Sequence, residues 1–273
     1  MPSLLEEHLK ARLSGGRKLL VPFLTAGYPD DAGFLSAARA AAEAGADAIE
    51  VGIPFSDPLA DGPTIQRTSQ LALDHGANLR DILHSLLHNH LSIRAPIVLM
   101  SYLNPIHAMG LDAFCDAAAE AGVAGVLVSD LPPEEMPAVA EKLRERGIDR
   151  IVLVAPTTEP SRIDALVTAA SGYVYLITRT GVTGAGGAFS GRLADQVARI
   201  RNRSSLPVVA GFGIRAVADV ERVKGLVDGV VIGARLLEAI GEAVGAGEAE
   251  ASTKRIDSAV RGLLVPIREA LGR

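Results

Sequence analysis

Short apolar runs recur along the whole chain, and segments with the spacing of amphipathic helices separate them. Eight runs stand out, at residues 19–26, 46–52, 96–102, 125–130, 151–157, 173–178, 207–213 and 229–234. Several are continuously hydrophobic, which is typical of parallel strands that are buried on both faces. Three of the intervening segments end in Gly45, Gly122 and Gly147, and glycine is a common helix stop.

Eight repeats of strand and helix predict an α/β fold with a parallel sheet, and the number of repeats favours a (β/α)8 TIM barrel. An open doubly wound sheet is the alternative, but its usual G-x-G-x-x-G turn is missing from "FLTAGYPDD" after the first run. We expect a single barrel domain over residues 1–273. Extra helices are predicted at the N-terminus (3–13) and the C-terminus (about 253–271), with "GAGEAEAST" as a loop before the second.

Composition narrows the classes of function. The chain has 273 residues, of which 48% are hydrophobic and 22% charged. Its net charge is −5, whereas a nucleic-acid-binding protein usually carries a basic patch. We find no secretory signal pattern and no uninterrupted apolar stretch of about 18 residues, so no membrane partner is expected. The single cysteine, Cys115, excludes an intramolecular disulfide and C-x-x-C metal sites. These features predict a cytoplasmic protein.

Glu50 lies inside the second apolar run, "ADAIEVG", where a buried carboxylate is costly unless it is paired or used. Side chains alternate along a strand, so Ile49 and Val51 suit the helix side, and Glu50 then points into the barrel between Ala48 and Gly52. It is also near the carboxyl end of its strand, where barrel enzymes place their chemistry. We therefore favour a functional role over the alternative, a structural glutamate paired with a buried Arg or Lys.

The loop that follows, "PFSDPLADGPTIQ", carries Asp57 and Asp61. A long loop after a barrel strand usually serves as a lid or binding loop. Asp57, which precedes Pro58, is equally suited to an Asx-turn. Asp61 lies further along and is placed to fold back over the barrel mouth towards Glu50. Two carboxylates in different settings can do different proton work.

Glycine-rich turns follow the last three predicted strands, in "TRTGVTGAGG", "AGFGI" and "IGARLLEAI". Barrels often bind phosphate with the loops after strands seven and eight, through backbone N–H groups and a helix N-terminus. The candidates are Gly184, Gly213, Gly233 and the Ala234 amide. Arg235 either adds positive charge there or is a solvated helix residue.

The stretch "IEVGIPFSDPLADGPTIQ" resembles the tryptophan synthase α subunit family, and "VPFLTAGYP", "LMSYLNPI", "GVLVSDLPPEE", "YVYLITRTGVTG" and "GFGI" extend the resemblance over nearly the whole chain. The resemblance implies a (β/α)8 barrel that cleaves indole-3-glycerol phosphate to indole and glyceraldehyde 3-phosphate. It implies no cofactor and no metal in this chain. It also implies a partner, a pyridoxal phosphate β subunit in an α2β2 complex, that receives the indole.

The resemblance also assigns residues. Glu50 and Asp61 match the catalytic acids of the family. The substrate-binding positions it implies are Phe23, Ile65, Leu99, Met100, Leu127, Tyr175 and Thr183, and the phosphate-binding positions are Gly184, Gly213, Gly233 and Ala234.

Departures from the family pattern concern the phosphate turns. The serine usual after Gly233 is replaced by Ala234, with Arg235 next, and Arg215 stands where Ser or Thr is usual. A hydroxyl donor is therefore lost, while the backbone amides remain. Two alternatives to the α-subunit function stay open: a stand-alone lyase that releases free indole, and an inert allosteric barrel. No role is predicted for His107 or Cys115.

Overall fold

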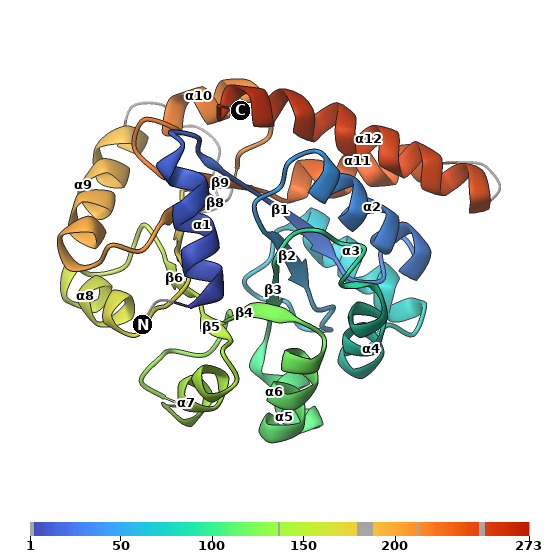
Figure 1. The fold of residues 1–273 in the computed structure, drawn as a ribbon, viewed down its shortest axis with the longest axis horizontal. Helices are drawn as coiled ribbons and strands as arrows, with labels where there is room; N and C mark the ends of the chain where they lie inside the picture. Colours follow the sequence, from blue (N-terminus) through green and yellow to red (C-terminus); the bar gives the residue numbers. More distant parts are fainter. Residues whose placement is uncertain (1–2, 136, 179–187, 212, 246–248, 273) are drawn as a thin grey trace.

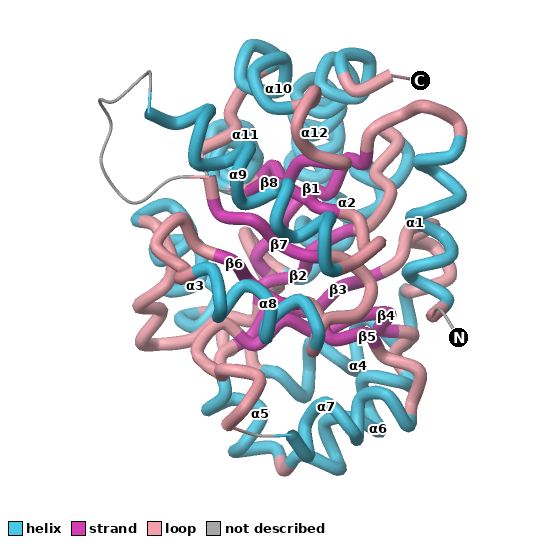
Figure 2. The backbone as a smooth tube through the Cα atoms, turned by 90° about the vertical axis from the view of Figure 1, so that its left-hand side faces the viewer, coloured by secondary structure: helices cyan, strands magenta, loops and turns pink. Residues whose placement is uncertain are grey.

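The computed structural model describes residues 3–135, 137–178, 188–211, 213–245 and 249–272, without the side chains of 188–192 and 249–252. Within these residues a central ring of strands is surrounded by helices (Figures 1 and 2). The strands are β1 (Leu19–Thr25), β2 (Ile49–Gly52), β3 (Ile97–Ser101), β4 (Val123–Val128), β5 (Asp149–Arg150), β6 (Val152–Val154), β7 (Val174–Ile177), β8 (Val208–Gly211) and β9 (Gly229–Ile232). The helices are α1 (Leu4–Ser14), α2 (Asp31–Glu43), α3 (Pro63–Asp74), α4 (Leu79–Asn89), α5 (Leu103–Met109), α6 (Leu111–Glu120), α7 (Pro137–Glu145), α8 (Pro160–Thr168), α9 (Ala188–Arg203), α10 (Val217–Val223), α11 (Ala234–Val244) and α12 (Ala249–Ala270).

The sheet is parallel throughout its described ladders, with the strand order β5-β4-β3-β2-β1-β9-β8-β7-β6. Its two ends are consecutive in the chain, because β5 pairs with β4 and β6 pairs with β7. Between them the Ile151 amide still donates to the Val126 carbonyl at 2.9 Å. The predicted fifth strand thus changes partners midway and closes the ring, which confirms the (β/α)8 barrel and explains why eight predicted strands become nine segments.

Local signals set the helix boundaries. Asp30 caps α2 by accepting a hydrogen bond from the Gly33 amide at 2.7 Å, which satisfies one of the free N–H groups of the first turn. The three predicted stops, Gly45, Gly122 and Gly147, all have positive φ angles of 95°, 71° and 70°. Only glycine adopts this conformation without steric cost, so each stop follows from the residue type.

The terminal helices cover the barrel as expected, with one difference. Helix α1 lies across the end of the barrel where the strands begin, and its Leu5 and Leu9 are buried in the core (Figure 1). Helix α12 begins at Ala249, so the prediction of a loop up to about residue 253 is wrong for its last part. The alanines and glutamate at 249–251 are strong helix formers, which favours the earlier start.

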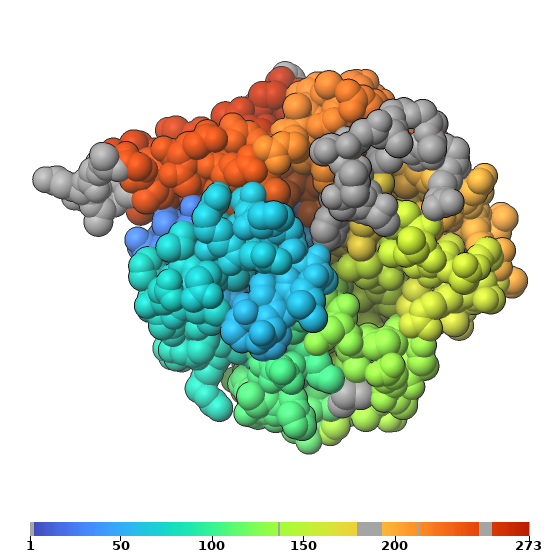
Figure 3. All heavy atoms as spheres, turned by 180° about the vertical axis from the view of Figure 1, so that it is seen from behind, coloured from blue at the N-terminus to red at the C-terminus, as the bar shows by residue number. Residues whose placement is uncertain are grey.

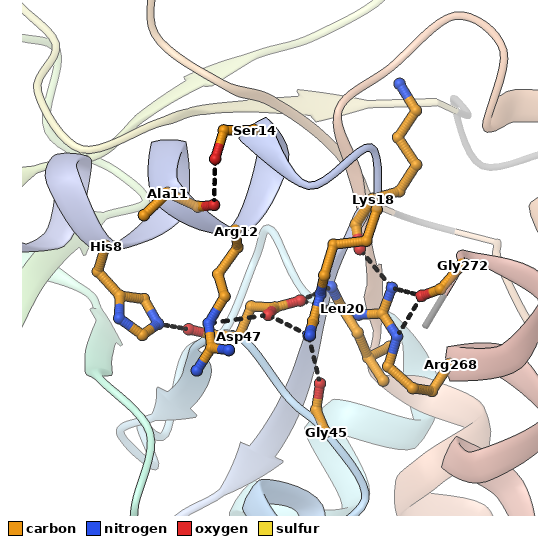
Figure 4. A network of polar contacts seen from close by, with 11 residues as sticks. His8, Ala11, Arg12, Ser14, Lys18, Leu20, Gly45, Asp47, Arg268 and Gly272 are labelled. Carbon is orange, nitrogen blue, oxygen red and sulfur yellow. Dashed lines mark hydrogen bonds and ion pairs between the residues drawn. The ribbon is translucent and has the colours of Figure 1, made fainter.

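A buried ion cluster ties the C-terminus to the same end of the barrel (Figure 4). The Asp47 carboxylate accepts from Arg17 at 2.5 Å, from Arg268 at 2.9 Å and from the Leu20 amide at 2.9 Å. Arg268 also donates to the Lys18 carbonyl at 2.6 Å, which joins α12 to the start of β1. Asp47 precedes β2, so this cluster stabilises the end of the barrel opposite the carboxyl ends of the strands.

Candidate active site

Glu50 lies in the middle of β2, and its side chain points into the barrel. It is directly paired with Phe23 on β1 and with Val98 on β3. Its Oε1 accepts a hydrogen bond of 2.5 Å from the Tyr173 hydroxyl. Tyr173 directly precedes β7, which lies across the ring from β2 in the strand order. A contact between strands on opposite sides requires both side chains to face the interior.

Burial changes the proton affinity of Glu50. Desolvation by burial raises the pKa of its carboxyl from 4.5 to about 8, although the Tyr173 hydrogen bond acts in the opposite direction. The pKa of Tyr173 is raised well above its ordinary value, first by burial and then by the charge of Glu50, so the phenol remains a donor. The second carboxyl oxygen, Oε2, accepts no hydrogen bond from the described residues. Glu50 therefore holds a proton near neutrality, and its second oxygen has no partner among the described residues.

Asp61 lies on the loop after β2, and Tyr102 holds that loop at the barrel mouth. The Tyr102 hydroxyl accepts from the Ala60 amide at 3.0 Å and hydrogen-bonds to the Asp61 carboxyl. The Gln66 side chain donates to the Asp61 carbonyl at 2.9 Å. Burial raises the pKa of Asp61 to about 6, and the Tyr102 hydrogen bond lowers it. Asp61 is thus largely ionised at neutral pH, whereas Glu50 is largely protonated.

Tyr175 on β7 interacts electrostatically with both acids, Glu50 and Asp61. Its pKa is raised well above the ordinary value, first by burial and then by the negative charges of Glu50 and Asp61. The phenol therefore lies within the field of both carboxyl groups. Gly211 on β8 makes room for it, because a Cβ there would collide with the phenol oxygen. The structure thus brings together the three residues Glu50, Asp61 and Tyr175.

Three residues of the predicted pocket wall lie on the interior side of the barrel: Phe23, Met100 and Leu127. The Phe23 ring covers Gly52, where any Cβ would overlap the ring, so the space expected beside Glu50 is filled by this aromatic side chain. Met100 pairs with Gly52 and with Leu127, and in parallel ladders paired residues share a face. Met100 and Leu127 are therefore on the interior side with Glu50, two positions along from it.

Leu99 is placed elsewhere than predicted. It pairs with Val51 and Val126, which face the helices, and its neighbour Met100 faces the interior. Adjacent residues of a strand cannot share a face, so Leu99 packs in the outer core rather than in the pocket wall. Ile65, in the first turn of α3, is half-buried and packs against the core.

The phosphate turns are described only in part. Gly213 has a φ of 87°, which a residue with a Cβ rarely adopts. Gly233 is the N-cap of α11, and its carbonyl accepts from the Leu236 and Leu237 amides at 2.8 and 3.1 Å. The amides of Ala234 and Arg235 come before these first hydrogen bonds of the helix and are suited to bind an anion. Thr183 and Gly184, which were predicted as substrate and phosphate positions, lie outside the described residues.

Two residues of the site, Tyr102 and Tyr173, were missing from the prediction. Tyr173 alternates with Tyr175 in "YVYLIT", so the period of a strand already places both on one face. Tyr102 ends the apolar run before α5, and nothing local indicates its contact with Asp61, which depends on how the loop after β2 folds.

Neither a metal site nor a membrane helix is found among the described residues. They contain no group of three or more His, Cys, Asp or Glu side chains placed to bind a metal ion. In the same part of the chain, each helix is too short or too polar to cross a membrane.

Comparison with known proteins places the chain in a family. The family model for the tryptophan synthase alpha chain matches residues 9–263. This chain belongs to the tryptophan synthase alpha chain family. Curated alpha chains from Dechloromonas aromatica and Burkholderia mallei are each 48% identical to it, over 84% and 89% of this chain and 86% and 90% of theirs.

Solved structures agree with the family assignment. A chain of the tryptophan synthase structure from Mycobacterium tuberculosis superposes with a TM-score of 0.87 at 34% identity, covering 99% of both chains. The tryptophan synthase subunit alpha from Legionella pneumophila superposes with a TM-score of 0.86 at 33% identity, also covering 99% of both chains. The barrel found here is therefore the fold of tryptophan synthase alpha chains.

Proposed function

We propose that this chain cleaves indole-3-glycerol phosphate to indole and glyceraldehyde 3-phosphate, as the alpha component of a tryptophan synthase. The observation that carries the proposal is the state of Glu50. Its carboxyl is buried inside the barrel with a pKa of about 8, one oxygen is held by Tyr173, and the other accepts nothing from the described residues. A carboxyl that keeps its proton at neutral pH and faces a binding site is suited to general acid catalysis.

The reaction is a retro-aldol cleavage, in which Glu50 moves two protons. Glu50 first donates its proton to C3 of the indole ring, which makes C3 tetrahedral and places positive charge towards N1. The carboxylate of Asp61 accepts a hydrogen bond from N1–H and stabilises that charge. Ionised Glu50 then takes the proton of the C3′ hydroxyl while the C3–C3′ bond breaks. The bonding electrons return to the indole ring, C3′ becomes the aldehyde carbon, and Glu50 is protonated again.

The phosphate of the substrate serves to position the reacting atoms. We place the phosphate at the amides of Gly233 and Ala234 and at the turn of Gly213, because Gly233 is the N-cap of α11 and Gly213 has a positive φ. Binding of the phosphate there holds the glycerol tail and sets C3′ against Glu50. Each step moves a proton between the substrate and a side chain, so no cofactor enters the scheme.

Turnover of indole-3-glycerol phosphate tests this proposal. Glu50→Gln keeps the size of the side chain and an acceptor for the Tyr173 hydroxyl but removes the transferable proton, so kcat is expected to fall by about 10²- to 10⁴-fold. Glu141→Gln, an exposed residue on α7, is the matched control and is expected to retain wild-type turnover. Wild-type turnover in the Glu50→Gln variant refutes the assignment of the acid.

We also propose that a pyridoxal phosphate β subunit binds at the mouth and receives the indole, in an α2β2 complex. The loop after β2 supports this, because its Leu59 side chain is 94% exposed beside a groove lined by Phe55, Asp57 and Pro58. Figure 3 shows the face opposite to that of Figure 1, where the blue segment that contains this loop borders a central hollow.

Assays with and without purified β subunit distinguish this proposal from its alternative. Strong activation of cleavage by the β subunit is the expected result. Full activity of the isolated chain, unchanged when β subunit is added, supports a stand-alone lyase that releases free indole. Leu59→Asp is expected to abolish the activation without changing the basal rate, because a charge is introduced at an exposed apolar contact position.

A further inference from the structure

A single carboxylate, Glu238 on α11, joins three segments that meet at the barrel mouth. Arg215, in the turn after β8, donates to Glu238 through both terminal nitrogens, at 3.2 Å to Oε1 and through a short contact to Oε2. Arg235, in the first turn of α11, donates to Glu242 at 2.8 Å and places a guanidinium nitrogen 3.7 Å from Oε2 of Glu238. Thr64, in the first turn of α3, donates to Oε1 at 3.2 Å. Glu238 is therefore the main partner of Arg215, a more distant partner of Arg235, and an acceptor for the start of α3.

The two arginines border the turns where the proposed function places the phosphate. Arg215 follows Gly213 by two residues, and Arg235 follows Gly233 by two. Arg235 also directly follows Ala234, which stands in place of a serine hydroxyl. The departures from the family pattern thus add two positive charges next to the turns where one neutral donor is missing.

Glu238 neutralises the charge of Arg215 when no phosphate is bound, whereas Glu242 is the closer partner of Arg235. Hydrogen bonding from Arg215 is the largest cause that lowers the pKa of Glu238, so the group is an anion at neutral pH. The side chain of Arg215 is 50% exposed and that of Glu238 is 23% exposed, and ion pairs this accessible contribute little stability. A phosphate dianion carries more charge than a carboxylate and offers arginine two oxygens at once. The phosphate is therefore able to replace Glu238 as the partner of the Arg215 guanidinium.

We propose that Arg215 and Arg235 bind the substrate phosphate in place of the missing hydroxyl, and that Glu238 is a positioning residue that holds Arg215 ready and releases it to the phosphate. This inference rests on the proposed function, because that function puts the phosphate at these turns. Thr64 lies three residues after Asp61, so its hydrogen bond to Glu238 also gives the Asp61 segment and the phosphate turns a common anchor.

Calorimetric binding of sn-glycerol 3-phosphate to the full-length chain tests the inference without turnover. Arg215→Ala and Arg235→Ala are each expected to raise the Kd about tenfold, since each removes a hydrogen bond to a charged group. Arg203→Ala is the matched control, because it removes the same charge from the last turn of α9, where Arg203 pairs with Asp164. Its expected change is less than about twofold, as for a screened charge away from the site. Equal effects of all three substitutions overturn the role of the two arginines.

Glu238→Gln tests the second half of the inference, because glutamine keeps an acceptor for Thr64 but not the charge that competes with phosphate. The Kd for sn-glycerol 3-phosphate is expected to fall several-fold, and this gain should vanish in the double variant with Arg215→Ala. A Kd that is unchanged or higher in Glu238→Gln overturns the role of Glu238. So does a gain that persists in the double variant.

Kinetics separate phosphate binding from a structural effect. The Arg215→Ala variant is expected to raise KM for indole-3-glycerol phosphate about tenfold with kcat within about twofold, because the contact binds a part of the substrate that does not react. Arg215→Lys should restore part of the KM, since the charge returns without the paired donors. A loss confined to kcat refutes the assignment. A wild-type chain that binds sn-glycerol 3-phosphate as expected but does not cleave the substrate refutes the proposed function instead.

Discussion

Replacing Glu50 by glutamine should stabilise the fold while it abolishes the chemistry. The buried carboxyl has a pKa of about 8 instead of 4.5, because burial disfavours its charged form. At about 1.4 kcal/mol per pKa unit, ionising Glu50 inside the barrel costs the folded state at most about 5 kcal/mol. Glutamine has nearly the same shape, never ionises, and still accepts a hydrogen bond from Tyr173.

The pH dependence of this effect has a definite sign. Folded Glu50 keeps its proton over a range in which the unfolded chain has already lost it. Its favourable contribution is therefore complete below about pH 4.5 and is lost as the pH rises to about 8. The advantage of Glu50→Gln over wild type is expected to grow from under about 1 kcal/mol at pH 5 to about 3–5 kcal/mol at pH 9.

Urea-induced unfolding followed by circular dichroism at pH 5, 7 and 9 measures this advantage. Glu141→Gln on the exposed face of α7 is the matched control, and its difference from wild type should stay within about 0.5 kcal/mol at each pH. A Glu50→Gln advantage that is the same at pH 5 and pH 9 refutes the reasoning, because it shows that Glu50 titrates alike in the folded and unfolded chains.

Three further substitutions test the surroundings of the acids. Tyr173→Phe removes the hydrogen bond that lowers the pKa of Glu50, so the basic limb of the pH profile of kcat should move above about pH 8. If this limb does not move, it reports the titration of a group other than Glu50. Asp61→Asn should cost at least about 10²-fold in kcat and remove an acidic limb near pH 6, and a limb that persists belongs to another group. Gly52→Ala should destabilise the fold by about 1–3 kcal/mol, seen as a lower Tm, because its Cβ overlaps the Phe23 ring; an unchanged Tm contradicts this packing.

The alternation of side chains along a strand correctly predicts which residues of β2 and β7 face the barrel interior. Glu50 and Tyr173 show that a period of two holds along β2 and into β7. The same rule excludes Leu99 and Met100 from sharing one wall, and the structure places Leu99 on the helix side with Val51. Resemblance to a family suggested Leu99, whereas the strand geometry alone would have removed it.

The broken fifth strand illustrates a different limit. The run 151–157 is apolar and predicts one strand, but the ladder of β5 begins at Asp149 and is interrupted at Ile151. The hydrophobic pattern indicates which residues are buried, and residues on both sides of the interruption at Ile151 are buried. It does not indicate which neighbouring strand they hydrogen-bond to, because that depends on where the ring of strands closes.

The sequence by itself determined the order of strands and helices, the glycine helix stops and the inward direction of Glu50, because each follows from interactions between residues close along the chain. Only the tertiary structure decided which side chains surround Glu50 inside the barrel. Its phenol partner comes from a residue 123 positions away, on the far side of the barrel, and Asp61 takes its place through Tyr102. Such contacts, and the desolvation that raises the pKa of Glu50, exist only once the ring has closed and water has been excluded from its interior.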